Sequence, residues 1–470
     1  MGRKCWLISI VAIVILLAAC GAEEKPSDDA LSAPKNPYET TWSTVSSEEH
    51  TSPTVETDPV IDLSNEGPVD EEIHLTADDR ITMVREASTY QWSSRFYITE
   101  DGSLYSGAKD PILIMRGVCE VVSFDGINAV ITNSGALYCW RKNEVPYKLI
   151  TDVKQAYVKG GLIYALIDNG DLFVWTDFDG KYTGYPELVM CNCAQIIHSE
   201  KQDYGYGAAI TASGELLMWR IVNDKYIVEP TKMMDDCASA VLCQDTFAAI
   251  TINGDLYMWG DNIFSECGAD SEMYPKIEAP MKVLSNVVSV KQSLGGFTAA
   301  LTGNGDLYIW GSNVAVGVGR PGTSTVGQLG LGSEEREIVP PTLLMSDVST
   351  MEIFGSQCAA VKNNGDLYYW CASVPELMLQ DVTRVQFTEG RYSAITSDGG
   401  LYLWGDNSHG EVGNGTDETC KEPYLALQDV SEYFLCSSYT VAITNDDSFY
   451  NWGAAVLGTG TYEYYPVKFY

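Results

Sequence analysis

The sequence predicts an all-β fold, a β-propeller of seven to nine four-stranded blades. The first observation is a motif, Ala-Ile-Thr-x-x-Gly-x-Leu-Tyr-x-Trp, that recurs nine times. Its copies are centred on Leu104, Leu137, Leu172, Leu216, Leu256, Leu307, Leu367, Leu401 and Phe449. They lie about 43 residues apart on average, a period typical of propellers and solenoids. The other two observations are the strand pattern inside each copy and a proline-led strand after most copies.

Each copy predicts three short strands. The first alternates apolar residues, as in Val-Val-Ser-Val at 287–290, and the second is small and apolar, as in Thr-Phe-Ala-Ala-Ile-Thr at 246–251. Asn-Gly or a similar pair then joins the second strand to the third in a tight hairpin. The third strand is large on both faces, as in Leu-Tyr-Met-Trp at 256–259. Strands of that kind belong to sheets that are covered on both sides, as blades stacked around an axis are.

A fourth strand is predicted where proline precedes an apolar run, as in PYKLI, PTKMM, PMKVL, PTLLM and PYLAL. The chain ends in another such strand at 465–470, whereas the first copy, near 86–106, lacks a clear one. We therefore expect the C-terminal strand to complete the first blade and close the ring, which removes two sheet edges. The divergent copies near residues 100 and 135 could instead form an appendage.

The N-terminal region precedes the predicted propeller, which we place at 81–470. Two basic residues precede an uncharged run at 5–22, the pattern of a secretion signal. The run contains Leu-Ala-Ala-Cys at 17–20, which resembles the lipobox of bacterial lipoproteins. The resemblance implies a signal peptide at 1–20, diacylation of Cys20 and an exported chain tethered to a bacterial membrane. An uncleaved signal anchor is the alternative, because the uncharged run is just long enough to span a bilayer.

Residues 21–80 are rich in Ser, Thr, Pro, Glu and Asp, which predicts a disordered acidic linker. The whole chain has 29 basic and 64 acidic residues, a formal net charge of −35. A nucleic-acid partner requires a basic surface, and the sequence shows no basic stripe, so we expect no nucleic acid to bind. The charge favours solubility at an anionic cell exterior.

Cysteine usage predicts neither a disulfide scaffold nor a metal site. Beyond Cys5 and Cys20, eleven cysteines remain, an odd number, and several lie within apolar strand patterns. Cys191 and Cys193 are too close together for a usual zinc knuckle, and no second pair at ligand spacing lies nearby. We expect mostly free thiols, no metal and no cofactor.

The ends of the third strands resemble repeats of the regulator of chromosome condensation family. The resemblance lies in Gly-Ser-Asn at 311–313 with Gly-Gln-Leu-Gly-Leu-Gly at 327–332, in 405–415, and more loosely in 260–268. It implies a propeller, usually of seven blades, and bacterial relatives that are exported and bind proteins through one face. This chain departs from the family in its nine motifs and its shorter period. The rival tryptophan-aspartate propeller has a similar period, but its Gly-His signature is missing here.

No catalytic constellation is visible in the repeats. Only His198 and His409 lie in the repeats proper. His409 lies in a turn of the family-like motif, and we expect His198 to end a strand. Four aspartates recur in the predicted hairpins, where turn formation explains them without catalysis: Asp171, Asp255, Asp306 and Asp366. The Gly-Gln-Leu-Gly-Leu-Gly segment lacks the Lys-Ser/Thr and the helix of a phosphate loop.

Long loops are predicted after Trp259, Trp310, Trp404 and Trp452, all on one side of the propeller. They supply interface-type residues: Phe264, Tyr274, Arg320, His409, Tyr462 and Tyr464. The leading hypothesis is a lipid-anchored, monomeric module that binds a protein or glycan at the cell surface. The alternatives are an extracellular lyase or hydrolase with a site at the central tunnel, and a passive adhesion or coat protein. The export signal argues against a nucleotide-exchange role, because small GTPases are cytosolic.

Overall fold

The computed structural model describes 66–69, 72–76, 79–86, 95–107, 109–124, 126–141, 144–159, 161–176, 186–197, 205–222, 225–226, 229–314, 326–333, 338–388, 390–436, 438–454, 456–457 and 460–469. The predicted signal peptide, Cys20 and the linker up to residue 65 lie outside the described residues. No helix that could cross a membrane is found in the described part of the chain.

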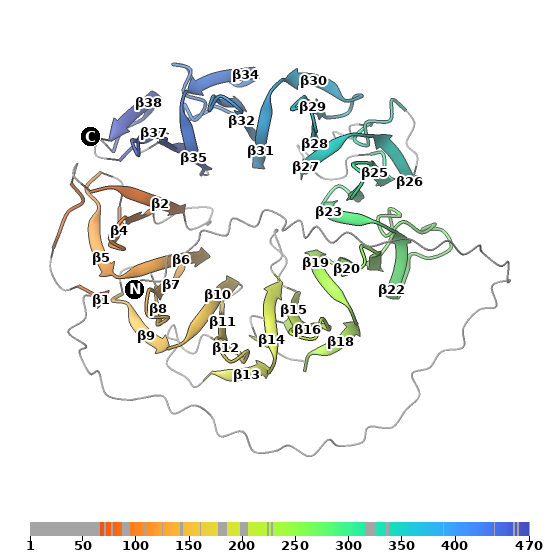
Figure 1. Cartoon of the computed structure of the whole chain (residues 1–470), viewed down its shortest axis with the longest axis horizontal. Helices are drawn as coiled ribbons and strands as arrows, with labels where there is room; N and C mark the ends of the chain where they lie inside the picture. Colours follow the sequence, from red (N-terminus) through yellow and green to blue (C-terminus); the bar gives the residue numbers. More distant parts are fainter. Residues whose placement is uncertain are drawn as a thin grey trace, which may run out of the picture. The chain divides into compact units, whose positions relative to one another are not determined.

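The described residues form nine antiparallel sheets, each built from consecutive strands, and the fold is a nine-bladed β-propeller (Figure 1). Blade 1 contains β2 (Ile81–Glu86), β3 (Arg95–Thr99), β4 (Leu104–Ser106) and β5 (Ile112–Arg116), with β1 (Gly67–Pro68) added outside β5. Blade 2 contains β6 (Val118–Phe124), β7 (Ile127–Thr132), β8 (Leu137–Arg141) and β9 (Tyr147–Ile150). Blade 3 contains β10 (Val153–Lys159), β11 (Leu162–Ile167), β12 (Leu172–Thr176) and β13 (Glu187–Met190). Blade 4 contains β14 (Cys193–Ile197), β15 (Tyr206–Thr211), β16 (Leu216–Val222), β17 (Lys225–Tyr226) and β18 (Thr231–Met234).

The remaining five blades follow the same order from the inner to the outer strand. Blade 5 contains β19 (Cys237–Cys243), β20 (Thr246–Thr251), β21 (Leu256–Asp261) and β22 (Lys276–Leu284). Blade 6 contains β23 (Val287–Ser293), β24 (Phe297–Thr302), β25 (Leu307–Ser312) and β26 (Ile338–Met345). Blade 7 contains β27 (Val348–Phe354), β28 (Gln357–Lys362), β29 (Leu367–Trp370) and β30 (Glu376–Leu379). Blade 8 contains β31 (Val382–Thr388), β32 (Arg391–Thr396), β33 (Leu401–Gly405) and β34 (Cys420–Leu427), and blade 9 contains β35 (Val430–Leu435), β36 (Tyr439–Thr444), β37 (Phe449–Gly453) and β38 (Glu463–Phe469).

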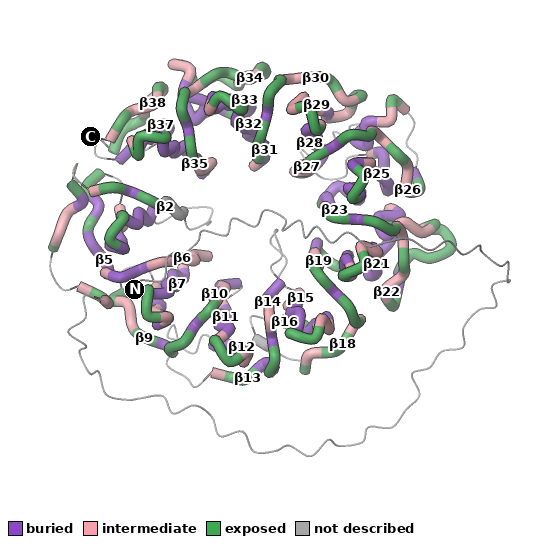
Figure 2. The backbone as a smooth tube through the Cα atoms, in the orientation of Figure 1, coloured by how far each residue is buried: buried purple, intermediate pink, exposed green. Residues whose placement is uncertain are grey.

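The nine motif copies found in the sequence are the third strands of the nine blades. The two divergent copies form blades 1 and 2, so the alternative of an appendage is wrong. The second strands pack on both faces, and every residue of β24 and β36 is buried (Figure 2). Small residues such as Ala299 and Ala300 lie there, because neighbouring blades approach closely on both sides of these strands.

The prediction that the C-terminal strand completes the first blade is wrong. β38 pairs with β37 inside blade 9, and blade 1 has its own outer strand, β5, paired with β4. Pro111 precedes β5, so this strand follows the same proline-led pattern as the others. The pattern at 111–116 was missed in the sequence, and each blade is a continuous piece of chain.

Blades 1 and 9 meet through side chains instead. The guanidinium of Arg95 lies 3.4 Å from the centroid of the Tyr439 ring and donates a hydrogen bond of 2.6 Å to the carbonyl of Ala454. The rings of Tyr97 and Phe449 meet edge to face, with centroids 6.3 Å apart. Because both sides of this contact are buried, apolar packing holds the first and last blades together without an exchanged strand.

Blade 1 begins earlier in the chain than the boundary predicted at residue 81. β1 pairs with β5 through Gly67 opposite Arg116, and the Leu113 amide donates to the Ile73 carbonyl over 2.8 Å. Leu75 is buried in the core that blades 1 and 9 share. The described part of 66–75, expected in the linker, therefore packs as an extra edge segment of blade 1.

Candidate functional site

The two faces of the propeller carry different connections. Because neighbouring strands in a blade are antiparallel, the loops between strands one and two and between strands three and four emerge on the same face. We call this the long-loop face. The tight turns between strands two and three, and the connections to the next blade, emerge on the opposite face, which we call the hairpin face.

On the hairpin face, the carboxylates of the recurring aspartates bond to neighbouring side chains near the hairpin turns. Asp255 forms an ion pair with Lys282 at 2.7 Å, and the pKa of its carboxyl is lowered by hydrogen bonds from Lys282 and Ser285. Asp366 accepts hydrogen bonds from the side chains of Gln380 and Asn364, which likewise lower its pKa. These carboxylates are occupied by local partners, so the turn interpretation accounts for them.

On the long-loop face, four loops begin at a Trp-Gly pair, and we call them the Trp-Gly loops. They are residues 262–275, 313–337, 406–419 and 454–462, in blades 5, 6, 8 and 9. Their glycines have φ angles of about 100°: Gly260 at 101°, Gly311 at 106°, Gly405 at 102° and Gly453 at 99°. At each glycine the pairing of the third and fourth strands shifts register, which is a β-bulge that turns the chain into the loop.

A side chain at these glycines would collide with backbone. A Cβ added to Gly260 would lie 2.1 Å from the carbonyl oxygen of Asp245, and one added to Gly405 would lie 2.2 Å from that of Gly390. Since the φ angle is also unfavourable for any L side chain, only glycine fits here without strain.

A buried asparagine holds each of the three longest Trp-Gly loops. The side-chain amide of Asn262 donates to the carbonyls of Ala269 and Tyr274, and its oxygen accepts from the Cys267 amide. Asn407 and Asn313 make corresponding contacts in blades 8 and 6. All three are almost completely buried, so their bonds form away from competing water.

Two of these loops also bind the following blade. The Glu266 carbonyl in blade 5 accepts from the Trp310 indole at 2.9 Å and from the Thr298 hydroxyl at 2.8 Å, both in blade 6. The Glu411 carbonyl in blade 8 accepts from Trp452 and Thr440 of blade 9 in the same way. We call each set of contacts a clasp. The family-like motif thus joins neighbouring blades.

Phe264 and His409 occupy equivalent positions, two residues before the glutamate of each loop. The Glu266 carboxylate accepts from the Phe264 amide at 2.7 Å, and burial raises the pKa of Glu266. The Glu411 carboxylate accepts from the His409 amide at 2.8 Å and also contacts its ring Nδ1 at 3.0 Å. Because the same turn forms around phenylalanine in blade 5, the His409–Glu411 pair is explained by loop structure without catalysis.

The predicted binding residues fall into two groups. Phe264 and Tyr274 share the loop of blade 5, where Tyr274 is 52% exposed. His409 of blade 8 stacks on Tyr462 of blade 9 with ring centroids 5.8 Å apart. Tyr464 packs beside Gly410, and its carbonyl accepts from the Gly415 amide. Arg320 and His198 lie outside the described residues.

The structure adds apolar residues that the sequence analysis did not name. Ile263 and Met273 in the loop of blade 5 are 58% and 67% exposed, and Leu294 between β23 and β24 is 42% exposed. Isolated apolar residues in loops show no helical or strand periodicity, so the sequence pattern does not predict their exposure. The only available signal was their position between loop-forming residues. We call Ile263, Phe264, Met273, Tyr274 and Leu294 the Ile263 patch.

A small cavity of about 100 Å³ lies within this patch, between blades 5 and 6. Ile263, Phe264 and Leu294 line it, and Phe264 packs over Gly296 of the next blade. Its acidic lining residues are Asp245, Asp261 and Glu266, and no basic residue occurs among the described residues that line it. The cavity is therefore lined by apolar, acidic and neutral polar side chains.

Within the described part of the chain, no group of three or more His, Cys, Asp or Glu side chains is placed to hold a metal ion. No disulfide joins any two of the eleven described cysteines, and seven of these cysteines are buried. Burial raises the pKa of Cys139, Cys237 and Cys267 to about 12 in each case. Such thiols act as small apolar side chains and not as nucleophiles.

No protein-family model matches the chain. Among solved structures, it is similar to human WBSCR16 at 17% identity, over 63% of this chain and 88% of that one, with a TM-score of 0.43. It is similar to yeast RCC1 (Prp20), solved with Kap60 bound, at 16% identity over 70% and 81% of the two chains, with a TM-score of 0.41. A third likeness is to BamB from Moraxella catarrhalis, at 11% identity over 72% and 99% of the two chains, with a TM-score of 0.39.

These likenesses are distant and concern the fold alone. The classification depends on the strand order and the Trp-Gly loops of the chain itself. The chain is a nine-bladed β-propeller whose better-preserved blades carry repeats like those of the regulator of chromosome condensation family.

Proposed function

We propose that this chain is a protein-binding module, displayed at a bacterial cell surface by a lipid on Cys20, that binds its partner through the Ile263 patch. The observation that carries the proposal is that Ile263 and Phe264 line one cavity together with Leu294 of the next blade. Met273 and Tyr274 add exposed apolar area in the same loop as Ile263. Exposed apolar groups that are contiguous mark interaction sites more often than scattered ones do.

The chemistry of the patch favours a protein over a glycan. Glycans are bound mainly through polar groups, whereas isoleucine, methionine and leucine contribute apolar area that a protein side chain can bury. The clasp between blades 5 and 6 fixes the loop that carries the patch, so little ordering entropy is lost on binding. The acidic lining favours a partner surface that is basic around an apolar centre.

Site-specific photo-crosslinking tests the proposed face. A photoreactive residue replaces Ile263 in the full chain, expressed in cells that display it. The matched control replaces Ile252, which is 67% exposed on the hairpin face of the same blade. We expect a discrete crosslinked protein from position 263 and none from position 252. Equal products from both positions, or none from 263, would refute the proposed face.

The anchor requires a separate test, because the binding face does not depend on it. Cells labelled with a clickable palmitate should incorporate it into the wild-type chain. Cys20→Ser should abolish incorporation and release the chain from the membrane fraction, since a single thiol carries the lipid. Membrane retention of the Cys20→Ser variant would favour the uncleaved signal anchor.

A further inference from the structure

The outer strands of all nine blades share a proline and differ at the residue two positions after it. That residue is lysine in blades 2, 4, 5 and 9 and leucine in blades 1, 3, 6, 7 and 8, namely Lys148, Lys232, Lys282, Lys468, Leu113, Leu188, Leu343, Leu377 and Leu425. In all nine blades it lies opposite the second residue of the third strand. The effect of lysine and of leucine at this position can therefore be compared among blades of the same fold.

Lysine at this position keeps its ammonium group in solvent or in an ion pair. Lys282 pairs with Asp255 and Lys232 with Glu215, each at 2.7 Å, in their own blades. Charged residues on an edge strand discourage the pairing of further strands. The leucines of blades 3, 6, 7 and 8 lack this protection and are between 38% and 49% exposed.

Blade 1 shows what covers such a leucine. Leu113 is only 2% exposed, because β1 and the residues after it lie along β5. The cover is held by backbone bonds: the Leu113 amide donates to Ile73, and the Val69 amide donates to the Ile114 carbonyl. An extended segment thus already binds one outer edge of this propeller and buries the leucine at the shared position.

Among the other leucine-bearing outer strands, β30 in blade 7 and β13 in blade 3 begin directly after their proline, as β5 does. Pro375 precedes β30 as Pro111 precedes β5, so every residue of β30 retains its backbone N–H. In β26 and β34 the corresponding prolines, Pro341 and Pro423, lie inside the strand and interrupt the row of donors.

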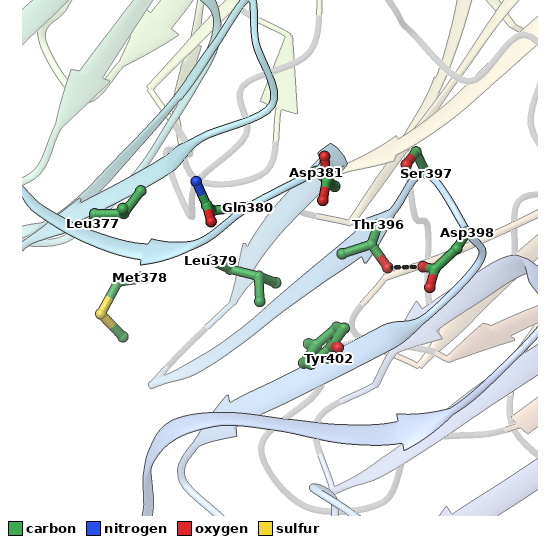
Figure 3. Close-up of a pocket in the computed structure, with 9 residues that line it drawn as sticks. All are labelled: Leu377, Met378, Leu379, Gln380, Asp381, Thr396, Ser397, Asp398 and Tyr402. Atoms are coloured by element: carbon green, nitrogen blue, oxygen red, sulfur yellow. Dashed lines mark hydrogen bonds between the residues drawn. The ribbon is translucent and has the colours of Figure 1, made fainter.

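A groove adjoins β30. A cavity of about 530 Å³ lies between the outer strand of blade 7 and the hairpin of blade 8 (Figure 3). Leu377, Met378 and Leu379 line one side, and Thr396 and Tyr402 are among the residues that line the other (Figure 3). The cavity is large enough to receive side chains from a segment paired with β30, and both apolar and polar side chains line it.

The groove carries negative charge. Asp381 and Asp398 lie at its rim, and no basic residue occurs among the described residues that line it. The Thr396 hydroxyl donates to Asp398 at 2.6 Å, and this bond together with the Gly400 amide lowers the pKa of the Asp398 carboxyl. Asp398 is therefore ionised at neutral pH and attracts a cationic side chain.

We propose that the edge of β30 is a second binding site, which takes an extended segment of a partner protein as a fifth strand of blade 7. The segment carries apolar side chains, which contact Leu377 and enter the groove, and basic side chains, of which the one nearest the rim faces Asp381 and Asp398. Main-chain hydrogen bonds supply affinity and the groove supplies selectivity. This site is independent of the Ile263 patch on the long-loop face.

A fluorescent peptide that alternates valine with lysine is the probe, titrated against the full chain in detergent and followed by anisotropy. We expect saturable binding. A second peptide, methylated at every second backbone nitrogen along the edge that pairs with β30, should not bind, because methylation removes the N–H donors. Leu377→Lys should weaken binding about tenfold, because it adds charge and removes the apolar contact. Lysine is tolerated at this position in four other blades, so the variant should fold.

The control is Leu188→Lys in blade 3, which makes the same change on an outer strand whose residues do not line the groove. Binding should change less than about twofold. A valine–glutamate peptide should not bind. Absence of binding by the valine–lysine peptide, equal loss in both variants, or undiminished binding of the methylated peptide would overturn the proposal. The photo-crosslink from position 263 should persist in Leu377→Lys, which separates the two sites.

Discussion

Blades 5, 6, 8 and 9 differ from blades 2, 3, 4 and 7 in the residue that follows the tryptophan of the third strand. It is glycine in the first set and Arg141, Thr176, Arg220 or Cys371 in the second. Only the glycine-bearing blades show a register shift at this position in the described pairing of the third and fourth strands. Glycine after the tryptophan thus accompanies the β-bulge from which each Trp-Gly loop begins.

The difference extends to the contacts between blades. The loop of blade 8 supplies the carbonyl that accepts from Trp452 of blade 9. Blade 7 has no Trp-Gly loop, and the indole nitrogen of Trp404 in blade 8 has no partner among the described residues. Aromatic rings fill this junction instead: Tyr392 lies 5.8 Å from Trp404 and 5.6 Å from Tyr369, between ring centroids. The propeller therefore joins some neighbouring blades through a clasp and others without one.

Replacing the glycine should give the largest effect. In Gly405→Ala, the new Cβ meets the Gly390 carbonyl at a positive φ, and we expect a loss of about 3 to 5 kcal/mol in the stability of blades 8 and 9. Cys371→Ala at the matching position in blade 7 should cost less than about 1 kcal/mol. Denaturant unfolding followed by tryptophan fluorescence measures both. An equal loss of stability in Gly405→Ala and Cys371→Ala would contradict the difference drawn between the two sets of blades.

Removing the buried asparagine should come next. Asn407→Ala leaves the Val412 amide and the carbonyls of Thr416 and Glu418 without their partner, which should cost about 2 to 3 kcal/mol. Hydrogen exchange should quicken across 408–419. Asn253→Ala, at an exposed hairpin, is the control and should leave stability unchanged. Unchanged exchange in Asn407→Ala would show that this side chain does not hold the loop.

A pair of matched tryptophan substitutions tests the contribution of the clasp to stability. Trp452→Phe removes a hydrogen bond of 2.7 Å to the Glu411 carbonyl, whereas Trp404→Phe removes an indole with no such bond among the described residues. Both changes lose similar ring area, so the first should cost about 1 kcal/mol more than the second. Midpoints of chemical unfolding give the difference. A larger loss for Trp404→Phe would contradict the account of the clasp.

Thiol alkylation gives the smallest and most local signal. Burial raises the pKa of Cys267 in the loop of blade 5 to about 12, so at pH 8 only about one molecule in ten thousand carries the thiolate there. Cys371 is only partly buried and should react first of the two. Asn262→Ala frees the Cys267 amide and should raise its alkylation rate about tenfold, as measured by mass spectrometry. An unchanged alkylation rate of Cys267 in Asn262→Ala would show that the Asn262 side chain does not protect this thiol.

Local patterns predicted much of this fold. The Asn-Gly hairpins, the large third strands and the proline-led outer strands each depend on neighbours in sequence, so the blades followed from them. Ring closure depends on contacts such as Arg95 with Ala454, which no local pattern encodes. The Trp310–Glu266 clasp and the placement of Leu294 beside Ile263 are likewise contacts between blades. The long-loop face could be predicted, as could two members of the Ile263 patch, Phe264 and Tyr274. The approach of Leu294 from the next blade could not.

Hydroxyl-radical footprinting tests most directly whether the Ile263 patch is the binding face. Met273 is 67% exposed in the patch, and Tyr465 is 61% exposed on the outer strand of blade 9. The account predicts that Met273 is oxidised several-fold more slowly on intact cells than in the purified chain, while Tyr465 changes little. Equal oxidation of Met273 in both settings, with Tyr465 also unchanged, would contradict it.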